Sequence, residues 1–270
     1  MNTFRAVLAV VIPVLASGCH SVRPPEQAAT PHFRLMTYNV NWGQPRPELA
    51  MEIIRRERPD IVCLQETTPQ WEKYLRATLA REYPHMSFRS SAGRTGGGLG
   101  FLAKVRPSEV AYIPSNTGWF DGWVMQFTTP AGPVQTLNVH LRPPVSDRGS
   151  WVRGYVTTGD DRERELKRFY EQARRDVPLI VAGDFNDGEG SGVVRWLQSK
   201  GMRNALREFD RSTPTWEWQT SALTLRRRMD HIVYGPEVYC YEARVIRDGA
   251  SDHFPVVATF GRRSEVKAGQ

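Results

Sequence analysis

Apolar residues recur along the chain with two periods, and each period predicts a different kind of element. Helical spacing is found in four segments, residues 47–57, 70–82, 160–176 and 193–200. Shorter apolar runs of strand length occupy residues 33–40, 60–65, 85–90, 98–104, 109–114, 179–184, 228–234, 237–247 and 255–260. Because helices and strands are interspersed along the chain, the pattern predicts an α/β fold.

Two further apolar runs indicate how the strands pair. Residues 122–128 and 134–141 are separated by the turn-forming segment Thr-Pro-Ala-Gly-Pro, which is typical of a β-hairpin. A hairpin requires antiparallel neighbours, so we expect mixed sheets covered by helices. Residues 142–158 carry no clear period and are expected to form a long irregular loop.

Polar residues that can carry chemistry lie repeatedly at the ends of these strands. They are Asn39, Asn41, Glu66, His140, Asp184, Asn186, Asp230, Asp252 and His253. Each one alone is explained by a polar turn, since Asp, Asn and Gly favour turns. Six such strand ends in one chain favour a single edge at which the strands converge on a polar site.

The residue types in this set limit the chemistry. The set contains carboxylates, amides and imidazoles but no cysteine, and such ligands suit Mg²⁺, Mn²⁺ or Ca²⁺ better than structural zinc. No H-E-x-x-H or G-x-S-x-G motif is present, and the glycine-rich segment at residues 93–101 lacks the G-K-[ST] ending of a phosphate loop. We therefore expect divalent-metal chemistry, with Mg²⁺ as the first candidate.

The charge balance favours an anionic partner. The 270 residues carry 36 Lys and Arg against 29 Asp and Glu, a formal net charge of +7, and the densest basic cluster is Arg226–Arg228. Nucleic acid, an anionic lipid surface or a phosphorylated solute would each suit such a chain. A solvated loop explains the arginine cluster equally well.

The N-terminal residues predict export. Residues 1–18 contain one cation, an apolar run from Ala6 to Ala16 and then small residues, the pattern of a signal peptide rather than of a membrane-spanning helix. Cys19 follows directly and resembles the lipidated cysteine of bacterial lipoproteins; ordinary secretion is the alternative. We expect residues 19–31 to form a tether, residues 32–262 the domain and residues 263–270 a polar tail. The expected location is the outer membrane, facing the periplasm or the cell surface.

Seven segments together resemble one known family. "MTYNV", "PDIVCLQE", "GLGFLAK", "LNVHL", "VAGDFND", "RMDHIVY" and "SDHFPV" occur in the order typical of the endonuclease/exonuclease/phosphatase superfamily. The resemblance implies a four-layer α/β/β/α sandwich of two mixed, mainly antiparallel sheets flanked by helices. It also implies metal-assisted hydrolysis of a phosphoester.

The resemblance further assigns roles to individual residues. The metal site would comprise Asn39, Glu66 and Asp252, and Asp184 would orient or deprotonate the attacking water. Asn186 would hold that water or a phosphoryl oxygen, while His253, paired with Asp230, and His140 would face the phosphate. Arg142 and Arg228 are weaker candidates for phosphate binding.

Three functions are compatible with the sequence. The basic chain favours a nuclease, expected as a monomer. The expected anchor, with Trp119, Phe120 and Trp123, favours a lipid phosphoesterase acting on sphingomyelin or a phosphoinositide, although a packed hairpin explains these aromatic residues as well. A non-catalytic surface lipoprotein that kept the fold is the third possibility.

Overall fold

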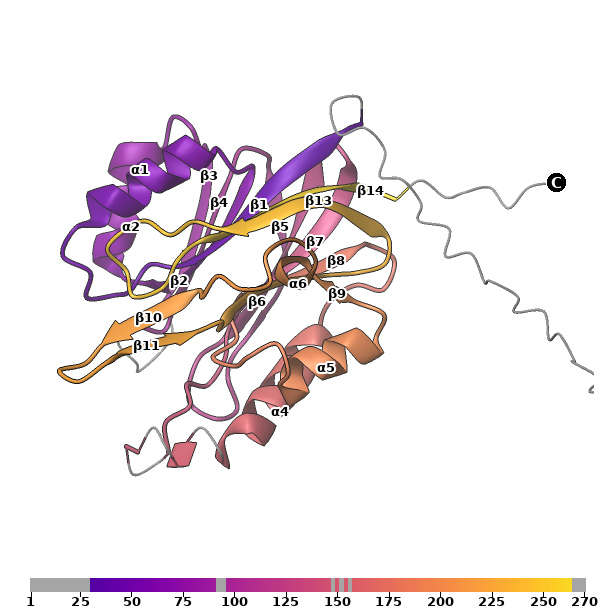
Figure 1. Cartoon of the computed structure of the whole chain (residues 1–270). Coiled ribbons are helices and arrows are strands. Elements are labelled where there is room, and N and C mark those ends of the chain that lie inside the picture. The colour runs from indigo at the N-terminus through magenta and orange to yellow at the C-terminus, as the bar shows by residue number, and fades with distance from the viewer. Residues whose placement is uncertain (1–29, 91–95, 147–148, 151–152, 155–156, 264–270) are drawn as a thin grey trace, which may run out of the picture.

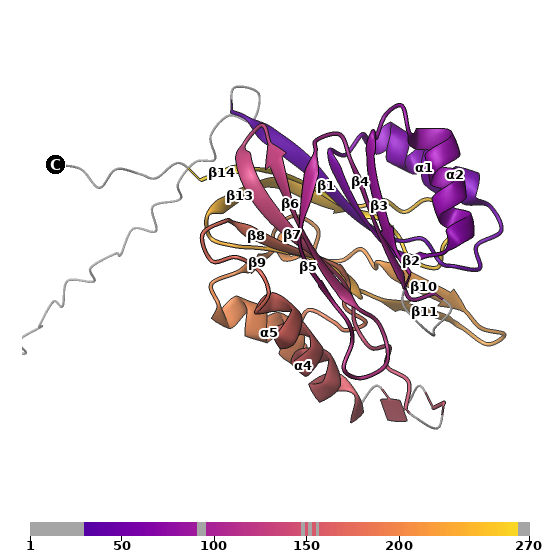
Figure 2. The same ribbon diagram turned by 180° about the vertical axis from the view of Figure 1, so that it is seen from behind.

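Two β-sheets packed face to face, with helices on both outer faces, make up the structure (Figure 1). The computed structural model describes residues 30–90, 96–146, 149–150, 153–154 and 157–263. Viewed from behind, the same order of helices, sheet, sheet and helices is seen (Figure 2). The predicted α/β/β/α sandwich is therefore confirmed.

The first sheet has the strand order β13-β14-β1-β2-β4-β3. Its strands are β1 (His32–Asn39), β2 (Ile61–Thr67), β3 (His85–Arg89), β4 (Gly98–Ala103), β13 (Val238–Val245) and β14 (Val256–Arg262). Helices α1 (Pro47–Glu57) and α2 (Pro69–Leu79) cover its outer face. Since β1 is parallel to β2 and antiparallel to β14, the ends of β1 and β2 lie at the same edge as the start of β14.

The second sheet has the strand order β5-β6-β7-β8-β12-β9. Its strands are β5 (Pro107–Ile113), β6 (Gly122–Thr129), β7 (Gly132–His140), β8 (Leu179–Asp184), β9 (Arg203–Asn204) and β12 (Asp230–Tyr234). Helices α4 (Gly159–Tyr170) and α5 (Gly192–Ser199) cover its outer face, and the short α6 (Ala205–Phe209) follows β9. The pairs His140–Asp184 and Asp184–Asp230 are register neighbours, so three polar strand ends lie side by side.

Three apolar layers fill the spaces between these elements. The central layer lies between the sheets and includes Phe101, Trp123 and Ile180, while separate clusters lie beneath α1 and α2 and beneath α4 and α5. Burial of this apolar surface is the main stabilising term of such a fold. The free thiols of Cys63 and Cys240 are buried in the central layer, as expected for structural cysteines.

One polar contact crosses the central layer. Gln65 Nε2 of β2 donates to Asn138 Oδ1 of β7 at 2.7 Å. Asn138 Nδ2 donates in turn to the carbonyl oxygens of Leu64 at 3.0 Å and Gly100 at 3.1 Å. Both side chains are fully buried, so these hydrogen bonds join the two sheets where no water competes.

A two-stranded sheet of β10 (Trp216–Gln219) and β11 (Thr224–Arg227) was not predicted. It forms an arm at one side of the molecule, below α2 in Figure 1. Its strands have four residues each and its outer part is exposed, so the apolar run that would predict a buried strand is missing. The base of the arm is joined to the rest of the fold by a β-bridge between Trp216 and His253.

Two further expectations are corrected, and one open alternative is decided in part. The helix expected at residues 160–176 ends at Tyr170, and tighter turns follow in which Gln172 and Ala173 donate to carbonyls three residues back. The described part of the 142–158 loop contains helical hydrogen bonds, from Gly154 to Ser150 and from Thr158 to Gly154. Phe120 and Trp123 are buried, as the packed interpretation expects, whereas Trp119 is partly exposed.

The expected export signal, Cys19 and most of the tether and of the C-terminal tail lie outside the described residues. Among the described residues, no helix is long and apolar enough to cross a membrane. The ordered elements run from His32 to Arg262. The lipid anchor and the location of the protein therefore stay predictions.

Candidate active site

The polar strand ends of both sheets meet at one edge of the sandwich. Asn39 and Glu66 come from β1 and β2, and Asp252 and His253 immediately precede β14. From the second sheet, His140 ends β7, Asp184 ends β8, Asn186 follows it and Asp230 begins β12. Hydrogen bonds and close contacts link these residues across the two sheets, so the expected convergence on one site is what the structure contains.

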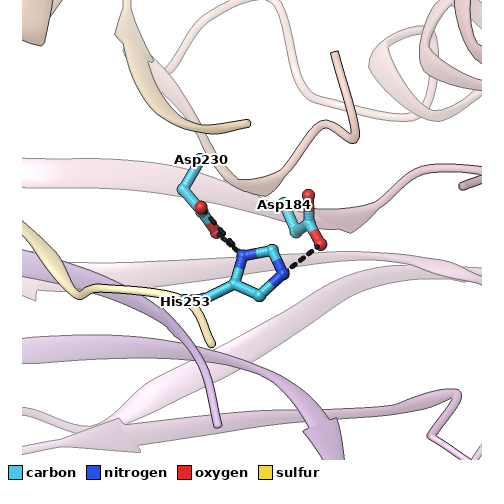
Figure 3. A group of neighbouring side chains, drawn as sticks. All are labelled: Asp184, Asp230 and His253. Carbon is cyan, nitrogen blue, oxygen red and sulfur yellow. Dashed lines mark hydrogen bonds and ion pairs between the residues drawn. The ribbon is translucent and has the colours of Figure 1, made fainter. Parts of the chain in front are cut away.

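His253 lies between two aspartates (Figure 3). Its Nδ1 is 2.9 Å from Asp230 Oδ2 and 3.1 Å from Oδ1, and its Nε2 is 3.7 Å from Asp184 Oδ2. Because a carboxylate only accepts hydrogen bonds, Nδ1 carries a proton toward Asp230. Asp230 thereby fixes the orientation of the ring and directs Nε2 to the edge where Asp184 lies.

Asn39 connects the two halves of the site. Its Nδ2 donates to Glu66 Oε1 at 3.0 Å and to Asp184 Oδ2 at 3.1 Å. The second oxygen of Glu66 accepts from the backbone N–H of Trp42 at 3.1 Å. The amide therefore holds one carboxylate from each sheet at a fixed separation.

Asp252 is held by two residues that the sequence alone did not assign to it. Its Oδ1 accepts from Asn41 Nδ2 at 2.8 Å and its Oδ2 accepts from Trp216 Nε1 at 3.0 Å. Asn41 is also a turn former, because its Oδ1 accepts from Gly43 N. Trp216 gives no signal in the sequence, since it reaches Asp252 only through the unpredicted arm.

His140 lies against the acidic group without a direct hydrogen bond to it. Its Nε2 is 3.6 Å from Asp184 Oδ2 and 4.0 Å from Glu66 Oε1, distances that leave room for a bridging group. The ring stacks on Phe120 with centroids 3.7 Å apart, and Nδ1 has no hydrogen-bond partner among the described residues. Phe120 thus sets the plane of the imidazole.

Two of the site residues have left-handed backbone conformations without being glycine. Glu66 has φ of 59° and Asn186 has φ of 50°. Asn186 Nδ2 donates to the carbonyl of Leu141 at 3.0 Å, and its backbone N–H donates to Asp184 Oδ1 at 2.8 Å. Such conformations are unfavourable for ordinary residues and occur often at functional sites, where the surrounding contacts impose them.

Burial and mutual charge shift the pKa values of the site in different directions. Burial raises the pKa of Asp184 to about 7, although the positive charge of His253 opposes this. Burial would lower the pKa of His253, but Asp230 and Asp184 outweigh it and the pKa lies well above its usual value. Burial, followed by the charge of His253, lowers the pKa of His140 well below its usual value. The site therefore contains one charged and one neutral imidazole at neutral pH.

Arg142 and Arg228, the weaker phosphate-binding candidates, both pair with acidic residues. Arg142 Nη1 lies 2.5 Å from Asp161 Oδ2, and Arg228 Nη1 lies 2.8 Å from Glu189 Oε1. Arg228 also lines an open pocket of about 250 Å³ beside the polar ends of β8 and β12. The other residues of this pocket are Asp187, Gly188, Glu189, Arg211, Arg227 and Met229.

A buried ion pair supports the loop that follows Asn186. Arg162 Nε lies 3.0 Å from Asp187 Oδ2, and the two side chains are 1% and 12% exposed. Asp187 also caps the turn, because its Oδ1 accepts from Gly188 N at 3.0 Å. Sequence reasoning missed Arg162, which lies in α4 and is buried despite its charge.

Replacement of this arginine should destabilise the whole fold. Arg162→Met removes the cation and leaves the largely covered Asp187 carboxylate unpaired, which costs up to about 3–5 kcal/mol, the loss found when one partner of a buried pair is removed. Urea unfolding at equilibrium measures the decrease in the free energy of unfolding. Arg174→Met, which removes the exposed pair with Asp176, is the control and should change stability little. Equal stabilities for the two variants would contradict this role of Arg162.

Comparison with known families identifies the chain. A profile described as the endonuclease/exonuclease/phosphatase family matches residues 36–253, 218 of the 270 positions. The chain belongs to the endonuclease/exonuclease/phosphatase family. The match includes every candidate catalytic and metal-binding residue from Asn39 to His253, and it supports a phosphoester hydrolase. A comparison with curated protein sequences found no significant match.

Solved structures with the fold of this family are similar at low sequence identity. An endonuclease/exonuclease/phosphatase from Beutenbergia cavernae is 20% identical with a TM-score of 0.67, covering 86% of this chain and 72% of that one. Danio rerio TDP2, solved with a single-strand DNA product, is 19% identical with a TM-score of 0.66, covering 85% and 99%. A family member from Bacteroides vulgatus is 18% identical with a TM-score of 0.62, covering 86% and 99%.

The donor set of this family member fits a divalent cation. Burial raises the pKa of Glu66, although hydrogen bonds from Asn39 and the Trp42 N–H oppose the rise. Within the described part of the chain, neither Glu66 nor Asp184, Asp230 or Asp252 forms an ion pair with Lys or Arg. The charged His253 lies against Asp184 and Asp230, whereas Glu66 and Asp252 have no Lys or Arg partner among the described residues, and such carboxylates favour a bound cation.

Two groupings could hold that cation. Ligand atoms of Asp184, Asp230 and His253 lie within 4.8 Å of one another, all three residues being buried. In this group, however, Nδ1 of His253 is already bonded to Asp230. Glu66, with Asn39 and Asp252 nearby, offers hard oxygen atoms on a partly exposed side chain, and it is the arrangement that we favour for Mg²⁺.

Proposed function

We propose that this protein is a divalent-metal-dependent phosphodiesterase that cleaves DNA or RNA by attack of an activated water. One observation carries the proposal: Asp184 is held by Asn39 at 3.1 Å and lies 3.7 Å from the Nε2 of His253, whose ring is oriented by Asp230. An acid–base carboxylate next to a charged imidazole at a buried edge is suited to hydrolysis of an anionic ester.

Each residue has a role that its environment supports. Asp184, with a pKa near neutrality, accepts the proton of the attacking water. His253, charged and oriented by Asp230, faces the phosphoryl oxygens and offers its Nε2 proton. Asn186 and the neutral His140 complete the group of donors around the phosphorus.

Glu66 and Asp252, supported by Asn39, would hold the divalent ion, and the oxygen ligands suit Mg²⁺, with Mn²⁺ or Ca²⁺ as alternatives. Such an ion neutralises charge on the phosphate and on its developing transition state. Asn41 and Trp216 keep both oxygens of Asp252 in fixed positions. Supporting contacts of this kind are common around metal ligands.

Glu66→Gln is expected to weaken Mg²⁺ binding at least about 10–100-fold, the range found when even supporting groups of metal sites are removed. Titration calorimetry with Mg²⁺ measures the affinity directly, and hydrolysis of plasmid DNA, single-stranded DNA, RNA and sphingomyelin with Mg²⁺ or chelator measures the activity. Glu52→Gln, an exposed carboxylate of α1, is the matched control. Full activity in chelator, or unchanged Mg²⁺ affinity of Glu66→Gln, would overturn the metal part of the proposal.

Nucleic acid is favoured over lipid as the substrate. The chain carries a formal charge of +7, and Arg211, Arg227 and Arg228 line a pocket at the catalytic edge, where they suit a phosphate backbone. Of the three aromatic residues that motivated a lipid substrate, Phe120 and Trp123 are buried and Trp119 is only partly exposed. A purely structural lipoprotein is disfavoured because a non-catalytic relic need not retain the acid, base and imidazole together. Anchoring through Cys19 at the outer membrane remains part of the proposal.

A further inference from the structure

One face of the β10–β11 arm carries large apolar side chains that are exposed. In the antiparallel register, Trp216 pairs with Arg227 and Trp218 pairs with Leu225, and side chains two residues apart in a strand share a face. The opposite face is identified by the ion pair between Arg226 and Glu217, at 2.8 Å. We call the surface of Trp216, Trp218, Leu225 and Arg227 the arm face; Trp218 is 50% and Leu225 42% exposed.

The inner end of the arm face contacts the candidate active site. Trp216 donates its indole N–H to Asp252, and its backbone bridges His253. The next residue donates its backbone N–H to the Asp252 carbonyl at 2.9 Å. Because these contacts fix the base of the arm on the catalytic segment, Trp218 lies one step outward from Asp252 along the same face.

A second exposed indole belongs to the residue that follows Asn41, the other hydrogen-bond partner of Asp252. Asn41 donates to the second oxygen of Asp252, and the adjacent Trp42 is 53% exposed. The backbone N–H of Trp42 donates to Glu66. Trp42 and Trp218 therefore belong to the two segments whose hydrogen bonds hold Asp252 and Glu66, and each residue is about half exposed.

We propose that Trp218 and Trp42 stack on nucleobases on either side of the scissile phosphate, so that the substrate is a single-stranded or locally unpaired nucleic acid. This inference rests on the proposed nuclease function. Exposed indoles are effective stacking platforms for bases and tolerate any sequence. Arg227 at the inner end of the arm face suits the adjoining backbone phosphate.

The placement of charge favours bases over a membrane surface. The segments that carry the two indoles bind Asp252 and Glu66 directly, so a lipid interface that received both rings would also have to desolvate these carboxylates. A nucleic acid strand places its apolar bases on the rings and its phosphate over the acidic, metal-binding centre. Single strands fulfil this geometry, since their bases are free to turn toward the protein.

Binding of a matched pair of strands tests the inference. The probes are a fluorescein-labelled single-stranded DNA and a strand of equal length and charge without bases, measured by fluorescence anisotropy with Mg²⁺ in an Asp184→Asn background that prevents cleavage. Trp218→Ala and Trp42→Ala should each weaken binding of the base-containing strand about 5- to 150-fold. Neither should change binding of the abasic strand. Trp218→Phe and Trp42→Phe should restore most of the affinity, and Phe209→Ala, an exposed aromatic residue of α6, should have no effect.

Three results would overturn the stacking. The alanine variants could bind the base-containing strand as tightly as the parent, or they could lose affinity equally for both strands. Alternatively, they could lose binding to phosphatidylcholine–phosphatidylglycerol vesicles while keeping that to DNA, which would assign the indoles to a membrane surface. Cleavage by the wild-type protein distinguishes failure of the stacking inference from failure of the nuclease proposal. If only the stacking inference is wrong, the wild type still cleaves single strands. If the nuclease proposal is wrong, it cleaves no nucleic acid.

Discussion

Asp184→Asn should lower kcat about 10²–10⁴-fold, the contribution of a well-placed general base. The amide keeps the shape of the carboxylate, and its single oxygen can still accept from the backbone N–H of Asn186, while its NH2 group takes the place of the oxygen that accepted from Asn39. It has no basic oxygen to accept the proton of water, so the chemical step fails while the fold persists. Steady-state hydrolysis of single-stranded DNA with saturating Mg²⁺ measures the loss. A variant with more than a tenth of the wild-type kcat would exclude Asp184 as the base.

The same substitution should stabilise the metal-free protein at alkaline pH. Burial raises the pKa of Asp184 to about 7, so the folded state retains a proton that the unfolded chain releases at a lower pH. Stability contributed by this group is therefore lost as the pH rises from about 4 through 7. The substituted amide carries no charge. In chelator, the thermal unfolding temperature of D184N should therefore be higher than that of the wild type at pH 8, and the two temperatures should approach each other at pH 5. The reverse order would contradict the raised pKa.

His253→Ala should also lower kcat about 10²–10⁴-fold, and Asp230→Asn should act through the same imidazole. The carboxylates of Asp230 and Asp184 outweigh burial and raise the pKa of His253, so the ring stays charged well above its usual titration range. Activity that depends on the charged ring should fall only at alkaline pH in the wild type. In Asp230→Asn, that alkaline limb of kcat should move to lower pH, because one of the two stabilising charges is gone.

A double variant tests whether the pair acts as one unit. If Asp230 works through His253, then His253→Ala combined with Asp230→Asn should be no slower than His253→Ala alone. If the fold-loss of kcat in the double variant equals the product of the losses in the two single variants, the two residues act independently. Circular dichroism and thermal unfolding of each variant serve as the control for folding, since both residues are buried.

Much of this site follows from the sequence because strand periodicity locates the ends of strands. Asp184, Glu66 and His140 each close an apolar run, and parallel neighbours bring their ends to one edge. The pairing of His253 with Asp230 was likewise expected, and the structure places Nδ1 within 2.9 Å of Oδ2. The catalytic roles of these residues stay predictions until they are measured.

The contacts that escaped prediction are those that depend on pairing between distant segments. Trp216 reaches Asp252 through an arm whose short strands and exposed residues give no periodic signal. Arg162 is buried because Asp187, 25 residues away in the chain, neutralises it. A cation in a helix normally indicates a solvated face, so no local pattern could have indicated this burial.

The hydrogen bonds between Gln65 and Asn138 have a consequence for the precision of the site. Its groups are divided between two sheets whose apolar faces could otherwise slide past one another with little change in energy. A displacement of one strand residue, about 3.3 Å, would separate Asn39 from Asp184 beyond any hydrogen bond. The hydrogen-bonded amides of Gln65 and Asn138 oppose such sliding, because it would leave unsatisfied polar groups in a dry interior. Alignment of the reacting groups is thus determined deep inside the molecule, by two side chains that never meet the substrate.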